Sequence, residues 1–171
     1  MEGRDEMSAF MTLSGQRIQL ELQQPAEVLQ WVSSLPAEVR SEISPAWLSA
    51  VSGLKTADPW YCMYQIRMMA VGVVAGSCAF KGPPDAFGVV ELAYGVELPW
   101  QGQGIATEAV RLLLKFCREQ SAVRSVIAHT VPNNASSVRV LEKCGFVCCG
   151  PVHHPEDGEV NRWELALCSS T

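Results

Sequence analysis

The sequence predicts a mixed α/β fold in which an antiparallel meander leads into a parallel βαβ unit, and three observations support this prediction. Apolar runs between residues 60 and 98 are separated by turn signals such as Gly82-Pro-Pro-Asp85, as in antiparallel strands. After Gly104 the spacing of apolar residues becomes that of a helix, and another apolar run follows at residues 123–130. A strand, a helix and a second strand in this order form a right-handed crossover between parallel strands.

The composition indicates one globular domain. The chain has 171 residues, 48% of them hydrophobic, which is enough to bury one core. Its net charge of −5 argues against a nucleic-acid-binding surface, and its longest apolar stretch, residues 70–80, is too short to span a bilayer. The seven cysteines lie mostly in apolar patterns, as reduced core thiols do. We expect a soluble cytoplasmic protein without nucleic-acid or membrane partners, with a flexible tail at residues 1–8 and a single domain at residues 9–171.

The N-terminal half is expected to contain an edge strand, two short helices and the meander. Residues 17–22 alternate between apolar and polar side chains, which predicts the edge strand. Residues 25–53 carry two helical patterns marked by prolines, and Trp31 and Trp47 are predicted to fill the core. The three strands of the meander are expected at residues 60–68, 69–81 and 87–98.

The C-terminal half is expected to contain two helices and a hairpin. A helix from Ile105 has an apolar stripe that packs on the sheet, and a second helix over residues 134–144 ends at Gly145 as a C-cap. The segment Glu156-Asp-Gly158 is a strong tight-turn signal. The strands around these elements are expected at residues 123–130, 146–153 and 160–167.

The most informative segment is the turn Gln101-Gly-Gln-Gly-Ile-Ala106, between the strand and the helix of the βαβ unit. Two closely spaced glycines let the backbone bend so that several N–H groups point to one anion, and the helix N-terminus adds partial positive charge. A phosphate-binding turn is therefore predicted. It lacks the Gly-Lys-Ser/Thr of a P-loop, and Thr107 stands where a dinucleotide fingerprint needs glycine or alanine.

Within this turn, Gln101, Gly104 and Ala106 match the Gln/Arg-x-x-Gly-x-Gly/Ala loop of GNAT acyltransferases. A second segment, Pro132-Asn-Asn-Ala-Ser-Ser-Val-Arg-Val-Leu-Glu-Lys-Cys-Gly-Phe146, is similar to the Asn-x-x-Ser…Leu-Glu-Lys-x-Gly-Phe segment of one GNAT branch. That branch acetylates ribosomal-protein and other N-termini, including N-terminal alanine. The resemblance implies the GNAT fold: a mostly antiparallel sheet of six to seven strands, with a central parallel pair splayed around the cofactor and helices on both faces.

The resemblance also implies acetyl-CoA as the co-substrate. In GNAT enzymes the thioester lies where the strand before the glycine turn splays from the next parallel strand, so the backbone of residues 96–98 would pair with the pantetheine arm. The pyrophosphate would meet the N–H groups of residues 102–106 and the side chain of Gln101. The expected cofactor-binding residues are Val96, Glu97, Leu98, Gln101, Gly102, Gln103, Gly104, Ile105, Ala106, Asn134 and Ser137. Asn134 is equally well explained as a helix N-cap, a role that is compatible with ligand contact.

The implied reaction is direct transfer of an acetyl group from the thioester to a primary amine, without a covalent intermediate. An alkyl amine is mostly protonated at neutral pH, so a carboxylate near the cleft is expected to take its proton. Glu91 and Glu97 are the candidates, because alternate residues of a strand share one face unless a bulge intervenes. Glu91 is preferred since it interrupts an apolar run, but a solvated strand glutamate explains either residue equally well. By resemblance to the same branch, Ser137 is the acid that protonates sulfur, and Tyr94 is a weaker candidate.

A zinc site is the alternative interpretation of the C-terminal cysteines and histidines, and the spacing disfavours it. Cys148 and Cys149 are neighbours in an expected strand and point to opposite faces, and no second cysteine pair has the usual two-residue gap. No metal is expected. His153 and His154 are placed on the lip of the hairpin, where histidines either assist proton transfer or are simply solvated.

Two other function classes remain beside an N-acetyltransferase. One is a non-catalytic acyl-CoA-binding domain, and the other is a nucleotide or phosphate binder that shares only the glycine turn. A carboxylate-lined cleft fits a cationic acceptor, whether a protein N-terminus, a polyamine or another small amine. A monomer and a homodimer are both compatible with the sequence.

Overall fold

One sheet of eight strands runs through the computed structural model, which describes residues 11–167. The strands are β1 (Thr12–Ser14), β2 (Ile18–Leu22), β3 (Tyr64–Met68), β4 (Val74–Phe80), β5 (Val89–Val96), β6 (Ser125–Thr130), β7 (Val147–His154) and β8 (Gly158–Ala166). Their order is β1-β2-β3-β4-β5-β6-β8-β7, and all neighbours are antiparallel except β5 and β6. The predicted tail at residues 1–8 lies outside the described residues.

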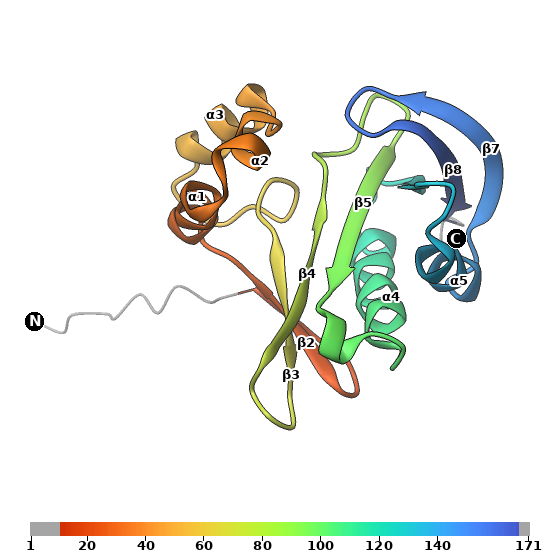
Figure 1. Cartoon of the computed structure of the whole chain (residues 1–171), viewed down its shortest axis with the longest axis horizontal. Helices are drawn as coiled ribbons and strands as arrows, with labels where there is room; N and C mark the ends of the chain where they lie inside the picture. The colour runs from red at the N-terminus through yellow and green to blue at the C-terminus, as the bar shows by residue number, and fades with distance from the viewer. Residues whose placement is uncertain (1–10, 168–171) are drawn as a thin grey trace, which may run out of the picture.

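Residues 11–167 form five α-helices and a short 3-10 helix. The helices are α1 (Pro25–Ser34), α2 (Ala37–Ser41), α3 (Pro45–Gly53), α4 (Ile105–Arg118) and α5 (Ala135–Lys143), and the 3-10 helix is η1 (Leu98–Trp100). In Figure 1, α1, α2 and α3 lie on one side of the sheet, and α4 and α5 lie on the other. The predicted mixed α/β architecture is confirmed.

The N-terminal strands form one edge of the sheet. Ile18, Leu20 and Leu22 are buried while the residues between them are partly exposed, and this is the alternation that predicted the strand. However, β1 pairs outside β2, so β2 is an inner strand and not the predicted edge strand. β1 has three residues, too few for alternation to reveal it, and it raises the strand number to eight instead of the expected six to seven.

The N-terminal helices differ from the prediction in number and in packing. Three helices replace the two expected, because α2 is a single short turn after Pro36. Trp31 is 44% exposed, so its predicted place in the core is wrong, whereas Trp47 packs against the core and donates from Nε1 to the Tyr61 carbonyl at 3.0 Å. The buried tryptophan of the core is Trp163, and Trp60 packs against the core with its ring tilted on two phenylalanines. These are Phe80 and Phe116, with centroid distances of 4.9 and 5.4 Å.

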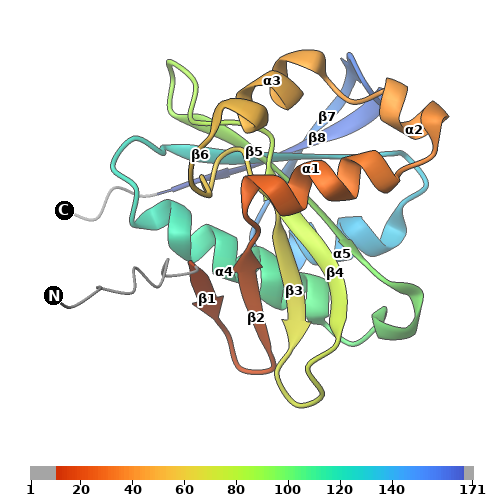
Figure 2. The same cartoon turned by 90° about the vertical axis from the view of Figure 1, so that its left-hand side faces the viewer.

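Helix α4 follows the predicted stripe. Its fully buried side chains, which include Ile105, Leu113 and Leu114, face the sheet, and its charged residues Arg111 and Lys115 are exposed. Figure 2 shows α4 passing behind β2 and β3. Because this stripe fixes the helix against the sheet, the helix N-terminus is held at the end of β5.

The parallel pair β5 and β6 separates part-way along its length. Pairing runs from Val89 with Ser125 to Glu91 with Ile127 and then stops, although β5 continues to Val96 against β4. Over the same stretch β6 stays paired with β8 as far as Thr130. Among the described residues, the side of β5 that faces β6 therefore has no strand partner beyond Glu91. The predicted splayed parallel pair is confirmed.

The C-terminal elements agree closely with the local signals. After α5, the N–H of Phe146 bonds the Leu141 carbonyl and the N–H of Gly145 bonds the Glu142 carbonyl, with Gly145 at φ +88°. This is the Schellman geometry that a C-terminal glycine favours. β7 and β8 form the predicted hairpin. Among residues 11–167, no helix has the length and apolar character that crossing a membrane requires.

Candidate active site

The glycine turn adopts a conformation that side chains disfavour. Gly102 and Gly104 have φ angles of +73° and +79°, and Gly104 directly precedes α4. A Cβ added at Gly104 would lie 3.3 Å from Nη2 of Arg17. The glycines therefore leave the start of α4 free of side chains. The first N–H groups of this helix have no intrahelical acceptor. This arrangement suits an anion.

A salt bridge from the turn between β1 and β2 holds the glycine turn in place. Arg17 donates from Nη1 to the Gln103 carbonyl at 2.7 Å and from Nε to Glu108 Oε2 at 3.0 Å. The other carboxylate oxygen of Glu108 accepts the backbone N–H groups of Gln16 and Arg17 at 2.8 Å. Burial alone would raise the pKa of Glu108, but these hydrogen bonds outweigh it and lower the pKa. A Cβ on Gly15 would lie 2.6 Å from Glu108 Oε1, so a side chain at this position would displace the carboxylate.

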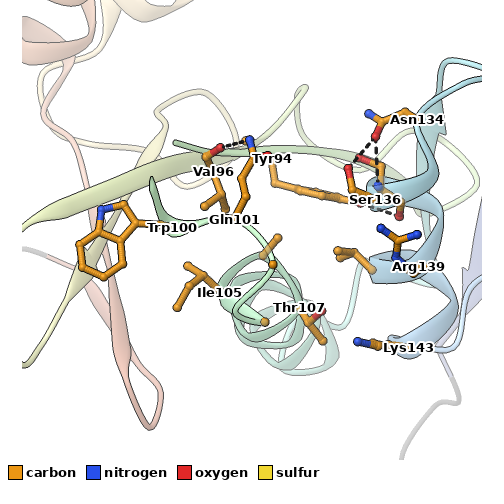
Figure 3. Close-up of a pocket in the computed structure, with 16 residues that line it drawn as sticks. Tyr94, Val96, Trp100, Gln101, Ile105, Thr107, Asn134, Ser136, Arg139 and Lys143 are labelled. Carbon is orange, nitrogen blue, oxygen red and sulfur yellow. Dashed lines mark hydrogen bonds between the residues drawn. The ribbon is translucent and has the colours of Figure 1, made fainter. Parts of the chain in front are cut away.

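A cavity of about 470 Å³ lies between the end of β5, the glycine turn and α5, and we call it the turn cavity (Figure 3). The predicted cofactor residues that line it are Val96, Gln101, Gly102, Gly104, Ile105, Ala106, Asn134 and Ser137. The further lining residues are Tyr94, Gly95, Trp100, Thr107, Ser136, Arg139, Val140 and Lys143. The cavity thus borders the side of β5 that has no strand partner.

The start of α5 joins this cavity to a second one. Asn134 caps the helix, since its Oδ1 accepts from the Ser137 N–H at 3.1 Å and from Ser136 Oγ at 2.9 Å. Tyr94 donates its hydroxyl to the Ser137 carbonyl at 3.2 Å, and burial raises the pKa of Tyr94 to about 12, so the phenol stays protonated. Capping and cavity lining therefore coexist at Asn134.

The second cavity, which we call the carboxylate cavity, has a volume of about 280 Å³ and surrounds Glu91. It shares Tyr94, Asn134 and Ser137 with the turn cavity. Its other lining residues are Lys81, Glu91, Leu92, Ala93, Ala128, His129, Thr130, Val131, Asp157 and Val160. The two cavities are therefore neighbours across the gap where β5 and β6 separate.

Glu91 is the centre of a charged cluster in this cavity. Its Oε1 lies 2.8 Å from His129 Nδ1, 3.2 Å from Lys81 Nζ and 3.7 Å from His154 Nε2. Burial would lower the pKa of Lys81, but the carboxylates of Glu91 and Asp157, and that of Glu156 at 3.6 Å, outweigh this and raise it. The ammonium of Lys81 is therefore held in its charged form.

A sequence profile described as an acetyltransferase (GNAT) domain matches residues 15–147 of the chain, which is more than half of it. The chain belongs to the GNAT acetyltransferase family. An uncharacterized N-acetyltransferase of Bacillus subtilis, YjdG, is 26% identical over 96 residues, which are 56% of this chain and 55% of that protein. The chain thus spans about half the length of this relative.

Solved structures support the GNAT fold over nearly the whole chain. A ribosomal-protein α-N-acetyltransferase, RimL, in complex with coenzyme A superposes with a TM-score of 0.70 at 16% identity, covering 94% of this chain and 100% of that one. An acetyl transferase from Salmonella typhimurium, which modifies the N-terminal serine of a ribosomal subunit protein, gives a TM-score of 0.69 at 16% identity. In that comparison, 92% of this chain and 100% of the other are covered. The expected family and fold are confirmed.

Three of the expected cofactor residues of this GNAT domain lie outside the lining of the turn cavity: Glu97, Leu98 and Gln103. β5 ends at Val96, and Pro99 lies in η1, so Glu97 and Leu98 do not extend the strand edge as expected. Gln103 instead completes the turn, since its Nε2 donates to the Pro99 carbonyl at 3.0 Å. Gln101 lines the cavity, and its Nε2 donates to the Val96 carbonyl at 2.8 Å.

The prediction that Glu91 and Glu97 face one cleft is wrong. Glu97 lines a third cavity of about 530 Å³, beside Glu27 and Trp31 of α1, whereas Glu91 lines the carboxylate cavity. β5 ends at Val96, and Glu97 is the N-cap of η1, so the parity of the strand no longer decides which cavity its side chain lines.

Sequence reasoning missed the cationic residues of the turn cavity. Arg139 and Lys143 lie one turn apart on α5, and their side chains point toward α4 across the cavity (Figure 3). With Ser136 they have the spacing i, i+3 and i+7, which places all three on one helix face. The signal available in the sequence was this spacing of Ser136, Arg139 and Lys143 along the second predicted helix.

Within residues 11–167, one group of side chains brings three metal-type ligand atoms together. It consists of Glu91, His129 and His154, whose ligand atoms lie within 4.8 Å of one another. Lys81 contacts the same carboxylate oxygen and already supplies the positive charge. Cys148 and Cys149 are exposed and belong to no such group among the described residues.

Proposed function

We propose that this GNAT protein transfers an acetyl group from acetyl-CoA to a primary amine, and that the acceptor is a protein N-terminus. The observation that carries the proposal is the pair of adjoining cavities. One combines a glycine turn with an unpaired strand edge, and the other collects carboxylates beside it. An anionic cofactor would bind in the turn cavity and a cationic acceptor in the carboxylate cavity, and both would reach the gap between β5 and β6.

Acetyl-CoA is proposed to occupy the turn cavity. Its pyrophosphate fits the backbone N–H groups of residues 102–106 and the start of α4, with Arg139 and Lys143 as further charge partners. The pantetheine arm fits the side of β5 that β6 leaves unpaired, as an added strand would. Asn134 and Ser137, at the junction of the two cavities, are proposed to meet its thioester end.

The proposed reaction is direct. The amine must lose a proton before its lone pair attacks the thioester carbonyl, and the carboxylate of Glu91 favours this loss in the carboxylate cavity. The C–N bond then forms, the C–S bond breaks, and the sulfur must receive a proton. The hydroxyl of Ser137 is proposed to supply it.

The protein N-terminus is proposed as the acceptor for two reasons. RimL and the Salmonella typhimurium enzyme are ribosomal-protein N-terminal acetyltransferases, and they share this fold. In addition, Glu91, Asp157 and Glu156 outnumber the single ammonium of Lys81 around the carboxylate cavity, and this excess of negative charge favours a cation. A cytoplasmic location stays a prediction.

Thermal unfolding with acetyl-CoA, CoA or ATP at matched concentrations tests the cofactor. A ligand at about 100 times its Kd adds about 2.7 kcal/mol, which raises the Tm of a chain of this size by roughly 5–10 °C. We expect this shift with both CoA forms and none with ATP. Thiol release with a peptide that begins with serine, compared with spermidine, then tests turnover and acceptor class. Equal shifts with ATP, or CoA binding without thiol release from any amine, would contradict the proposal.

A further inference from the structure

We propose that His129, held by Glu91, is the catalytic residue that takes the proton from the acceptor amine. This inference rests on the proposed acetyltransferase function and concerns which atom accepts the proton. Glu91 then acts as a positioning residue: it holds the imidazole and does not itself remove the proton.

The partner of His129 determines its tautomer. Its Nδ1 lies 2.8 Å from Glu91 Oε1, and the side chain of His129 is only 9% exposed. An ionised carboxylate can only accept hydrogen bonds, so Nδ1 carries the hydrogen in this pair. The lone pair of the neutral ring is therefore on Nε2.

This lone pair is available in the carboxylate cavity. His129 lines that cavity, and its Nε2 has no hydrogen-bond partner among residues 11–167. Within residues 11–167, the hydroxyl of Tyr64 is the one side-chain polar atom that is fully buried and has no hydrogen-bond partner. Nε2 of His129 has no partner in this range either, so it must be open to solvent. Nε2 is thus accessible on the side of the ring away from Glu91, in a cavity that adjoins the turn cavity.

The separation of β5 and β6 explains why these two residues meet. Glu91 is the last residue of β5 that pairs with β6, opposite Ile127. His129 lies two residues further along β6, on the same face as Ile127. Its side chain therefore stands at the point where the gap opens, and Glu91 reaches it diagonally across the last paired position.

Charged and titratable groups face His129 from several elements. The groups that face it are Glu91 from β5, Lys81 after β4, His154 from β7, and Glu156 and Asp157 from the hairpin turn. The ring of His154 lies 4.8 Å from that of His129, between centroids, and its Nδ1 is 3.2 Å from Asp157 Oδ2. Three carboxylates and one ammonium therefore lie around the two rings, so an imidazolium that forms at His129 during the reaction has carboxylate partners.

The same contacts explain why Glu91 is not the base. Its Oε1 already interacts with the ammonium of Lys81 and with Nδ1 of His129. A proton on this carboxylate would cost both charge-assisted interactions at once, whereas a proton on His129 Nε2 leaves both in place and strengthens the second.

Two protons leave the amine nitrogen during the reaction. The substrate ammonium transfers the first to Nε2, which gives an imidazolium and a neutral amine. The amine lone pair forms the C–N bond to the acetyl carbon, and the C–S electron pair leaves with the sulfur. The remaining excess proton on nitrogen reaches the sulfur through Ser137, which yields the amide and the free thiol. The imidazolium then releases its proton to solvent.

The test is steady-state kinetics of the full chain with acetyl-CoA and a peptide that begins with serine, together with acetyl-CoA binding by calorimetry. For His129→Gln we expect kcat to fall about 100-fold or more, since general base catalysis typically contributes 10²–10⁴-fold. The Kd for acetyl-CoA should stay within twofold. His153→Gln is the matched control, because His153 is 75% exposed, pairs with Glu159 on the hairpin and lines none of the three cavities. It should retain wild-type kcat.

Imidazole rescue separates chemistry from packing. In His129→Ala, added imidazole should restore kcat saturably, whereas Glu91→Gln should lose kcat with no response to imidazole. A His129→Gln variant with kcat within threefold of wild type, or an unfolded His129→Ala variant together with a fully active Glu91→Gln, overturns the assignment. If the wild-type protein binds no acetyl-CoA, or turns over no amine, the proposed function itself has failed.

Discussion

Replacing Gly104 by alanine tests the glycine turn, because this position joins backbone conformation to anion binding. Its φ of +79° lies in the left-handed region, where a residue with a Cβ is less stable by about 1–2 kcal/mol. If the turn keeps its conformation, this strain should lower the Tm by roughly 2–8 °C in a chain of this size. If the turn relaxes instead, its N–H groups rotate away from the anion, and the Kd for CoA should rise by about tenfold for each 1.4 kcal/mol lost.

The assay combines thermal unfolding without ligand with calorimetry of CoA binding. Gly53→Ala at the end of α3 is the matched control, since Gly53 has no positive φ and a Cβ there meets nothing within 4 Å. It should leave both quantities unchanged or raise the Tm slightly. A Gly104→Ala variant that keeps its Tm within 1 °C and its Kd within twofold would refute the link between this turn and the cofactor.

Three further changes follow from the same structure. Glu108→Gln should weaken the contact with Arg17 and lower the Tm at pH 7. Because folding lowers the pKa of Glu108, the stability that this carboxylate contributes is present above the ordinary value of 4.5 and is lost as the pH falls through the folded value. The Tm values of wild type and variant should therefore converge in acid and not in base. Arg139→Gln should weaken CoA binding and flatten its salt dependence, as measured by calorimetry at two ionic strengths, whereas the exposed Arg118→Gln on α4 should not. Tyr94→Phe removes the hydrogen bond to the Ser137 carbonyl and should lower the free energy of unfolding by about 0.5–1.5 kcal/mol, which denaturant titration measures; an unchanged midpoint would mean that this bond does not hold α5.

The local features of the backbone and of the helices could be predicted from the sequence. The left-handed glycines of the turn, the cap at Asn134, the Schellman end at Gly145 and the stripe of α4 each depend on a few neighbouring residues. Such signals survive folding because the same backbone geometry produces them in any context. The glycine turn and the α5 segment were therefore enough to indicate the family.

The charged cluster could not be predicted in the same way. Lys81, Glu91, His129 and His154 come from four separate parts of the chain, and only the pairing of β5, β6 and β8 with the β7 hairpin brings them together. The end of β5 at Val96 likewise removed Glu97 from the cleft, which strand parity alone placed there.

The sequence by itself determined the elements, the turn that fits an anion and the family, because these depend on periodicity and on short motifs. The tertiary structure decided which side chains lie together: Arg17 against the Gln103 carbonyl of the glycine turn, Arg139 and Lys143 in the turn cavity, and His129 beside Glu91. The physical reason is that strand register and helix packing set distances between residues far apart in the chain, and no local pattern encodes those distances.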